Sequence, residues 1–371
     1  MSHLSARAPF VRRGRPVRGR VLTLVAVAGL IALTACAGRG AETPAEPSAG
    51  GADAAVVERI AIVTPEKESD HGWNQQGLLS AEAAAEQLGL ELEAHTNVGY
   101  DNTESILTQV AGGDVDLIIA HASGFNTAGH RVGQQTGVPT LVVDYENNVP
   151  GLVATAIPAP QQGAYLAGVA AAMQTETGIV GIVASAENLN WFLMAGGFAQ
   201  GVYSVDPSID VVMAYVGPAN YADSAGAAQT TKQVIAAGAD VIMGMGNGAT
   251  VGYLQAIETA QTDYSISYIA TIGDVSDIAP DMNTVFATVL WDFTDTYIQA
   301  VTDIEAGTFG THGYELTVAN GGLSLRESAA FTAEMTEAVQ AASAGITDGS
   351  IDVVTADTKD SVQALIDSRG A

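Results

Sequence analysis

Residues 59–75 read RIAIVTPEKESDHGWNQ, an apolar run followed by a polar segment that contains a tryptophan. An Ala-rich amphipathic stretch then continues from Asn74 to Leu88. A short apolar run is typical of a buried strand, and the helical periodicity after it predicts a helix. We therefore expect a strand over Arg59–Val63, a helix over Asn74–Leu88 and a polar loop between them.

The same alternation of apolar runs and Ala-rich stretches continues through nearly the whole chain. Continuous apolar strands that alternate with helices indicate parallel sheets buried on both faces. Two successive sets of strands predict two doubly wound lobes. Further strands are expected at Glu91–Asn97, Val115–His121, Thr140–Asp144 and Leu152–Ile157, and then at Gly178–Ala184, Asp210–Val216, Asp240–Met245, Ser267–Ile272 and Val285–Leu290. Helices between them are expected at Thr103–Gly112, Gln161–Gln174, Asp223–Ala237 and Val251–Ala260.

The composition is strongly acidic. The 371 residues include 41 Asp and Glu but only 14 Lys and Arg, for a formal net charge of −27. From Cys36 onward, 8 basic residues oppose all 41 acidic ones. Such a surface repels phosphate backbones, which excludes nucleic acid as a partner. The single cysteine excludes a disulfide framework and a CxxC metal site.

The N-terminus has the composition of an export signal. An arginine-rich segment precedes Val21–Ala35, an uninterrupted run of apolar and small residues that is too short for a comfortable membrane span. The tetrapeptide LTAC at 33–36 resembles the lipobox of bacterial lipoproteins. We expect a signal peptide over 1–35, lipidation of Cys36 and a flexible tether over 36–56, which place the body at the extracytoplasmic face of the cell membrane. An anchor helix with a chance cysteine is the alternative, and the export route, Sec or twin-arginine, stays open.

The segments that follow the strands form the candidate site, because ligands of parallel sheets bind beyond the carboxyl ends of the strands. All three tryptophans, Trp73, Trp191 and Trp291, fall in these segments and favour a pocket that stacks flat rings. Neighbouring polar side chains, Ser123 and Asn247 among them, supply directed hydrogen bonds. The segments are Ser69–Gln75, His121–Asn126, Asp144–Asn147, Asn188–Met194, Gly244–Ala249, Gly273–Asp277 and Trp291-Asp292.

Cationic side chains are scarce in these segments. Between Ile60 and Ala330 the chain has four, of which only Lys67 lies at the margin of a candidate segment. A pocket for phosphate or carboxylate normally contains a guanidinium. We therefore expect a neutral or cationic ligand.

Gly244–Ala249 matches the G-x-G-x-x-A pattern of a dinucleotide site, since it follows a predicted strand and opens a helix. Export of the chain and the Asp- and Asn-rich surroundings favour a tight turn instead, one that lets backbone approach a ligand or a neighbouring strand. The histidines lack metal-ligand spacing, and the sequence contains no P-loop, G-x-S-x-G or H-E-x-x-H motif. We expect no cofactor, no metal and no catalytic residue.

Several segments together resemble the basic membrane protein (BMP) family, the substrate-binding lipoproteins of ABC transporters that include purine nucleoside receptors. The resemblance runs from about Arg59 to Thr355. Its most specific part is Gly163–Ala171, which is similar to a long YLAG helix of the family. The other matching segments are Asp70–Gln75, Ser123–Phe125, Asp144, Gly238–Ile242 and Gly349–Val353.

The resemblance implies a purine sandwiched by aromatic side chains, its base read by an aspartate and an asparagine and its ribose held by an aspartate and a lysine. At the family's lysine position this chain has Trp291, which replaces a hydrogen-bond donor to the ribose by an indole. The resemblance places Asp70, Asn74, Phe125 and Asp144 at base contacts, Trp191 or Met194 at the second stacking position, and Asp274 near the ribose.

The implied fold is the type I periplasmic-binding-protein-like fold, an α/β fold of two doubly wound Rossmann-like lobes joined by three crossings. We expect the N-terminal lobe to contain residues 57–157 and about 291–311, and the C-terminal lobe residues 158–290 and about 312–371. The crossings then fall near Ile157–Pro160, near Leu290 and near Phe309–Gly313.

The implied function is that of a monomeric solute-binding lipoprotein of an ABC importer. The cleft would capture a neutral flat heterocycle, in the first place a purine nucleoside, and the closed form would deliver it to the permease. The alternatives are a secreted α/β enzyme that acts on nucleosides and a lipoprotein that senses a ligand for a membrane receptor. Turnover of the ligand would identify the first, and neighbouring genes would identify the second.

The lipobox-like tetrapeptide gives a testable prediction. In Cys36→Ser the sulfur that carries the lipid is gone, so we expect the protein to leave the membrane fraction or to keep its signal peptide. Cell fractionation with mass determination of the product measures both outcomes. A variant that stays in the membrane with unchanged mass and extraction behaviour would show that Cys36 is not lipidated.

Overall fold

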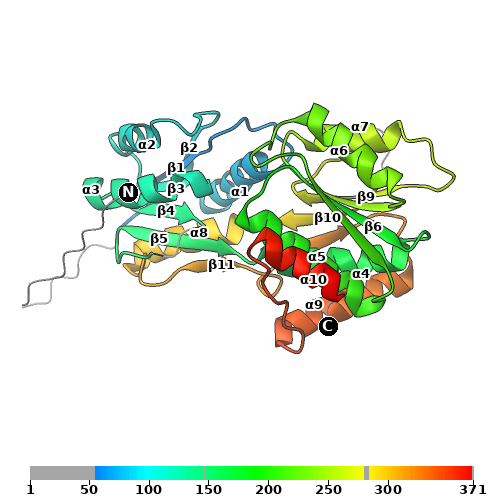
Figure 1. The fold of residues 1–371 in the computed structure, drawn as a ribbon. Helices are drawn as coiled ribbons and strands as arrows, with labels where there is room; N and C mark the ends of the chain where they lie inside the picture. Colours follow the sequence, from blue (N-terminus) through cyan, green and yellow to red (C-terminus); the bar gives the residue numbers. More distant parts are fainter. Residues whose placement is uncertain (1–54, 145–146, 280–283, 370–371) are drawn as a thin grey trace, which may run out of the picture. The chain divides into compact units, whose positions relative to one another are not determined.

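Two six-stranded sheets form the framework of the residues that the computed structural model describes, 55–144, 147–279 and 284–369 (Figure 1). The strand order is β11-β5-β4-β3-β1-β2 in the N-terminal lobe and β12-β10-β9-β8-β6-β7 in the C-terminal lobe. Of these strands only β12 runs antiparallel to its neighbour. The predicted α/β fold of two doubly wound lobes is confirmed.

The N-terminal sheet is buried except at its edge. The strands β3 and β4 are buried at every residue, whereas the residues of the edge strand β2 are all exposed or half-buried. Its strands are β1 (Arg59–Val63), β2 (Glu91–His95), β3 (Leu117–Ala120), β4 (Thr140–Val143), β5 (Val153–Pro158) and β11 (Tyr314–Leu316). Its helices are α1 (Trp73–Leu88), α2 (Thr103–Ala111), the 3₁₀ turn Ser123–Phe125, α3 (Asn126–Thr136) and α8 (Thr294–Ala306).

The C-terminal sheet repeats this arrangement. Its central strand β8 is buried at every residue, as the continuous apolar sequence predicts. Its strands are β6 (Ile179–Ala184), β7 (Asp210–Tyr215), β8 (Val241–Met245), β9 (Ser267–Ile272), β10 (Val285–Trp291) and β12 (Leu323–Glu327). Its helices are α4 (Pro160–Gln174), α5 (Leu189–Val205), α6 (Ser224–Ala236), α7 (Thr250–Glu258), α9 (Ala333–Asp348) and α10 (Lys359–Ser368).

Three segments connect the lobes. The first lies between β5 and α4, since α4 packs against α5 of the C-terminal lobe. The second lies between β10 and α8, since α8 packs against α1 of the N-terminal lobe. The third lies between β11 and β12, which belong to different sheets.

The third crossing lies later than expected. The strand β11 pairs with β5, and Tyr314 Oη donates a hydrogen bond to Asp303 Oδ2 of α8 at 2.9 Å. The crossing therefore follows Leu316 rather than Phe309–Gly313, and residues 312–316 do not belong to the C-terminal lobe. A three-residue strand carries too little periodicity to be recognised, so its pairing decides its place.

The helices α4 and α5 approach each other backbone to backbone. A Cβ at Gly168 would lie 2.1 Å from the Phe198 carbonyl oxygen, and a Cβ at Gly201 would lie 2.1 Å from the Tyr165 carbonyl oxygen. These two positions therefore admit only glycine. The close packing holds α5, whose first turn reaches the space between the lobes.

A cluster of aromatic rings lies where the second crossing meets the N-terminal lobe. The His121 ring stacks on Trp73 with ring centroids 4.7 Å apart, and Phe293 meets both rings edge-on. The indole of Trp291 packs edge-on against the indole of Trp73, with ring centroids 5.7 Å apart. The crossing and the start of α1 therefore share one packed core.

His121 is the polar centre of this cluster. Its Nε2 lies 3.0 Å from the Trp73 carbonyl oxygen and its Nδ1 lies 2.8 Å from Tyr297 Oη. A neutral ring that donates from Nε2 and accepts at Nδ1 satisfies both contacts. Burial lowers the pKa of His121 to about 4, although the bond to Trp73 opposes the shift. The ring is thus neutral at physiological pH.

This buried histidine makes stability depend on pH. Because the folded-state pKa is about 4 and the unfolded value about 6.5, the unfolded chain alone takes up the proton between these values. The contribution of the neutral His121 ring to the free energy of unfolding is therefore complete above about pH 6.5 and is lost as the pH falls toward 4. Glutamine at this position keeps a donor and an acceptor but does not titrate. Between pH 7 and pH 5 we therefore expect the free energy of unfolding of His121→Gln to fall by about 2 kcal/mol less than that of the parent chain. Urea unfolding at both pH values measures it, and equal losses in the two proteins would contradict the assignment.

Candidate ligand-binding site

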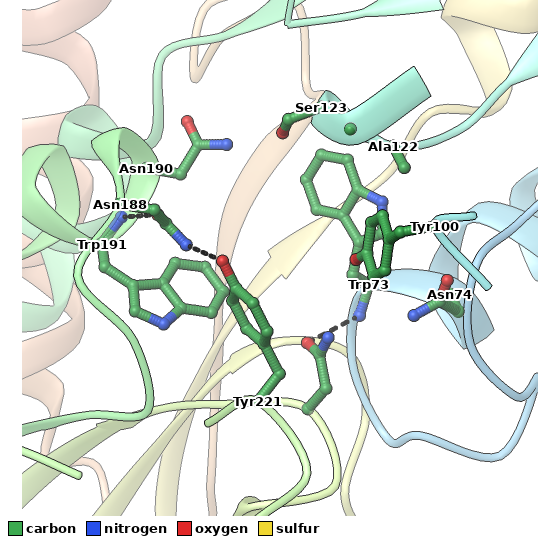
Figure 2. Close-up of a pocket in the computed structure, with 11 residues that line it drawn as sticks. Trp73, Asn74, Tyr100, Ala122, Ser123, Asn188, Asn190, Trp191 and Tyr221 are labelled. Atoms are coloured by element: carbon green, nitrogen blue, oxygen red, sulfur yellow. Dashed lines mark hydrogen bonds between the residues drawn. The ribbon is translucent and has the colours of Figure 1, made fainter. Parts of the chain in front are cut away.

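A cavity of about 250 Å³ is lined by residues of both lobes. They come from the segments after β1, β2 and β3 in the N-terminal lobe and after β6, β7 and β8 in the C-terminal lobe, so the cavity lies at the carboxyl ends of the strands (Figure 2). This is where a doubly wound sheet binds ligands. The lining residues are Trp73, Asn74, Tyr100, Ala122, Ser123, Gly124, Asn188, Asn190, Trp191, Tyr221 and Asn247.

The two lobes contribute matching aromatic pairs. Trp73 follows β1 and Tyr100 follows β2, while Trp191 follows β6 and Tyr221 follows β7. The strands β1 and β6 occupy equivalent places in their sheets, next to the edge strands β2 and β7. Figure 2 shows the two pairs on opposite sides of the cavity. Because the two lobes have the same strand order, the Trp and Tyr pair of one lobe lies opposite the Trp and Tyr pair of the other.

Both indoles are held by their ring nitrogens. Trp73 Nε1 donates to the His121 carbonyl oxygen at 3.0 Å, and Trp191 Nε1 donates to Ser185 Oγ at 3.0 Å. Both side chains are nearly buried, at 9% and 3% relative exposure. Each indole N–H is thus satisfied inside the protein, so what the tryptophans present to a ligand is ring surface.

Four asparagines supply the polar part of the lining, and each is anchored within the protein. Asn188 Oδ1 caps α5 by accepting from the Trp191 backbone N–H, and its Nδ2 donates to Tyr221 Oη at 2.8 Å. Asn74 Nδ2 donates to Asp70 Oδ2 at 2.7 Å. Because an amide group has two N–H donors and a carbonyl acceptor, each anchored side chain retains hydrogen-bonding capacity for a ligand.

The lobes touch each other around the cavity. The Trp73 backbone N–H donates to Asn247 Oδ1 at 3.3 Å, and Asn190 Nδ2 donates to Asp144 Oδ2 at 2.9 Å. Gly72 permits the first contact, since a Cβ there would lie 2.6 Å from Asn247 Oδ1. Residues of the lining therefore also join the two lobes.

The lining residues themselves are all uncharged, and carboxylates lie behind them. Asp144 accepts from Ser123 Oγ at 2.6 Å as well as from Asn190, and burial raises its pKa although both hydrogen bonds oppose the shift. Burial raises the pKa of Glu66, with Asp70 adding to the shift and a hydrogen bond with Asn247 opposing it. Neither acid is itself among the lining residues.

Five of the residues predicted from the sequence meet in this cavity. They are Trp73, Asn74, Ser123, Trp191 and Asn247. Asp144 lies at its edge through its bonds to two lining residues. The glycine-rich segment around Asn247 forms a turn that brings this side chain to the opposite lobe, in keeping with the interpretation as a turn that lets backbone approach a neighbour.

Four residues predicted as ligand contacts do not line this cavity. Phe125 is fully buried beneath Tyr100 in the core of the N-terminal lobe, and Met194 is fully buried in the core of the C-terminal lobe. Trp291 is the last residue of β10 rather than part of the following segment, and it supports Trp73 from within the core. Asp274 accepts two hydrogen bonds from Arg326, each 2.6 Å long, beside a separate hollow.

Asp70 orients the site without lining it. Its carboxylate is buried and accepts hydrogen bonds from the backbone N–H groups of Gly72, Asn74 and Gln75. It therefore satisfies donors at the start of α1 that have no partner within the helix. These bonds fix the backbone at the start of α1, where Trp73 and Asn74 lie, and Asp70 itself is not among the lining residues.

The sequence interpretation missed six lining residues as individual candidates. Tyr100 and Tyr221 follow β2 and β7, two strands whose ends it did not consider as site segments. Applying the strand-end rule to every strand would have included both tyrosines. The others, Ala122, Gly124, Asn188 and Asn190, lie within segments that were considered.

The part of the chain that the structure describes contains neither a candidate metal site nor a helix that could span a membrane. No cluster of three or more His, Cys, Asp or Glu side chains there could hold a metal ion. None of the helices in the same part combines the length and the apolar character needed to cross a membrane. The segment around Cys36 lies outside the described residues.

Comparison with solved structures supports the fold. A solute-binding protein of an ABC transporter system from Aeropyrum pernix superposes with a TM-score of 0.69 at 20% identity over 84% of this chain and 98% of the other. One from Conexibacter woesei gives 0.68 at 19% identity over 80% and 99%. A carbohydrate transporter solute-binding protein from Agrobacterium radiobacter, in complex with D-arabinose, gives 0.56 at 18% identity over 77% and 99%.

Sequence comparison supplies the family. No curated protein matched the chain. The model of the Bmp family, described as ABC transporter substrate-binding protein PnrA-like, matches residues 57–353, which include all twelve strands of the two sheets and every lining residue of the cavity. The chain therefore belongs to the Bmp family of PnrA-like substrate-binding proteins of ABC transporters.

Proposed function

We propose that this substrate-binding protein is a lipoprotein, anchored through Cys36, that captures a neutral flat heterocycle between its lobes and presents it to an ABC permease. The observation that carries the proposal is the lining of the cavity. Two Trp and Tyr pairs face each other across it, and the remaining lining side chains are uncharged.

The aromatic pairs favour a ligand with two flat faces. Stacking of a base on one aromatic side chain is worth about 1–3 kcal/mol. The indoles of Trp73 and Trp191 are immobilised through their ring nitrogens, so little rotamer entropy is lost when a ring stacks on them. The cavity volume of about 250 Å³ suits a small ligand, since pockets for drug-sized molecules measure about 300–1,000 Å³.

The asparagines favour a ligand with a hydrogen-bonding edge. An amide offers both N–H and C=O, which is the pattern that the edges of nucleobases present. Nucleosides, which the resemblance to nucleoside receptors implies, and nucleobases are therefore the compounds to examine first. An anionic ligand would lose its hydration without gaining a cationic partner in this lining.

Closure of the lobes is the step that couples binding to transport. The bonds from Trp73 to Asn247 and from Asn190 to Asp144 each join the two lobes, so both depend on the closed arrangement. A ligand stacked between the aromatic pairs adds contacts to both lobes and stabilises that arrangement. The permease then distinguishes the closed from the open form.

Substitution of one pocket tryptophan tests the site. In Trp191→Leu the stacking surface is lost, so we expect binding of the ligand to weaken about 5- to 150-fold, which corresponds to about 1–3 kcal/mol. Phe198→Leu is the matched control, because Phe198 is a fully buried aromatic on the same helix that does not line the cavity. Calorimetric affinities and urea unfolding of both variants separate binding from stability. If Trp191→Leu loses stability as Phe198→Leu does but binds normally, the pocket is misplaced.

The uncharged lining predicts discrimination against phosphates. We expect a neutral nucleoside to bind at least tenfold more tightly than its 5′-monophosphate, a difference of about 1.4 kcal/mol or more. Titration calorimetry of the matched pair at pH 7.5 measures the ratio, and a repeat at high salt separates the local effect from repulsion by the acidic surface. Equal or tighter binding of the monophosphate would contradict a lining without cationic partners.

A further inference from the structure

The loop between β1 and α1 of the N-terminal lobe lies between two turns of the C-terminal lobe. A Cβ at Gly72 would lie 3.2 Å from the Gly246 carbonyl oxygen, in the turn after β8. A Cβ at Gly273, in the turn after β9, would lie 3.3 Å from the His71 carbonyl oxygen. The backbones of the two lobes therefore meet on both sides of this loop, at residues that do not line the cavity.

Non-glycine residues on both sides of the second contact have a left-handed backbone. The φ angle is 56° at His71 and 73° at Ile272, the residue before Gly273. Such a φ is a genuine outlier for a β-branched residue such as isoleucine. Backbone strain of this kind persists only where the surrounding structure imposes it, and it clusters at ligand clamps and switch regions. The strain therefore favours a role of this contact in the closing of the lobes.

The side chain of His71 meets a carboxylate across the same boundary. Its Nδ1 lies 3.5 Å from Asp277 Oδ1, in the turn after β9. The side chain of His71 is 15% exposed and that of Asp277 is 59% exposed. Nδ1 is buried and makes no hydrogen bond among the described residues. The contact is therefore an ion pair that requires a protonated imidazole.

Asp277 is the one carboxylate within 4.0 Å of the His71 ring among the described residues. On the same turn, Asp274 is held in its bidentate pair with the guanidinium from β12. Asp70 accepts backbone N–H groups at the start of α1, and α1 contributes the uncharged Gln75, which accepts from the His71 backbone N–H. The turn after β8 carries no charged side chain over residues 246–249. The other charged residues of the loop that contains His71 are Glu66, Lys67 and Glu68.

From these observations, and on the basis of the proposed function, we infer that His71 and Asp277 are positioning residues that hold the lobes closed and raise the affinity for the ligand without lining the cavity. Because the two residues belong to different lobes, the pair forms only in the closed arrangement. A ligand that binds this arrangement gains the free energy of the pair.

The pair makes binding depend on pH. An imidazole becomes charged as the pH falls from about 8 to about 5. Protonation of His71 favours the closed form, since the imidazolium pairs with Asp277 there. By linkage, the pair therefore strengthens binding at the acidic end of this range and contributes little at the alkaline end.

Calorimetric titration of the full chain and of Asp277→Asn tests the inference, with the tightest binder among adenine, adenosine, hypoxanthine, inosine, uracil and uridine as the probe. We expect Asp277→Asn to bind about two- to fivefold more weakly than the parent chain at pH 6, as for an ion pair with one exposed partner. At pH 8.5 we expect the two affinities to agree within about 1.5-fold. Equal affinities at pH 6, or the same loss at both pH values, would overturn the inference and leave the proposed function intact. Absence of binding by all six compounds in the parent chain would overturn both.

Exchange of the two side chains provides a second readout. His71→Asp alone places two carboxylates against each other, and aspartate tolerates the left-handed backbone. We expect this variant to bind at least about twofold more weakly than the parent chain. Addition of Asp277→His restores a pair of opposite charges, so the double variant is expected to bind more tightly than His71→Asp at pH 6. A double variant that binds no more tightly would overturn the inference.

His95→Gln is the matched control. His95 Nε2 lies 2.7 Å from Glu93 Oε1, and both residues belong to β2, so this pair lies within one lobe. We expect its loss to leave the affinity at pH 6 unchanged. A loss of affinity as large as that of Asp277→Asn would show that closure is not the cause, and would overturn the inference. Urea unfolding at pH 6 without ligand confirms that each variant remains folded.

Discussion

The mutual hydrogen bonds of Trp73 and His121 hold together the parts of this protein that matter for binding. The indole N–H of Trp73 donates to the His121 carbonyl oxygen, and the His121 ring bonds back to the Trp73 carbonyl oxygen while stacking on the indole. Tyr297, which follows the second crossing, bonds to the same imidazole. One wall of the cavity and one connection between the lobes therefore rest on the same buried contact. Gly77 makes it possible, since a Cβ there would lie 2.3 Å from the imidazole.

The doubling of the fold explains the composition of the cavity. Equivalent strand ends in the two lobes carry equivalent side chains, Trp73 with Trp191 and Tyr100 with Tyr221. When such lobes close on each other, the Trp and Tyr side chains of one lobe face those of the other, so the cavity has an aromatic surface on both sides. A flat ligand is the shape that contacts both surfaces at once. The preference for a flat ligand that we propose is in this sense a consequence of the topology.

The carboxylates of Asp70, Asp144 and Asp274 are each bonded within the protein. Asp70 caps a helix, Asp144 bonds to two lining residues, and Asp274 is paired with Arg326. What remains at the surface of the cavity is neutral amide, hydroxyl and aromatic ring. A protein with a formal net charge of −27 thus lines this cavity with uncharged side chains among the residues that the structure describes.

Local sequence was sufficient for strands β1 to β10, the two-lobed fold and five lining residues, because strand and helix periodicities are local and ligands bind where parallel strands end. The sequence also showed that the chain is strongly acidic and that, apart from Lys67 at the margin of one segment, the candidate segments lack cationic side chains. Tertiary structure alone decided which strand-end residues face the cavity. Trp291 lies in the core because β10 extends to include it. Asp274 does not line the cavity, and it bonds instead to Arg326, 52 residues later in the chain. The place of β11 likewise depends on its pairing with β5, more than 150 residues earlier in the chain. Such contacts join residues that are remote in sequence, so no local pattern records them.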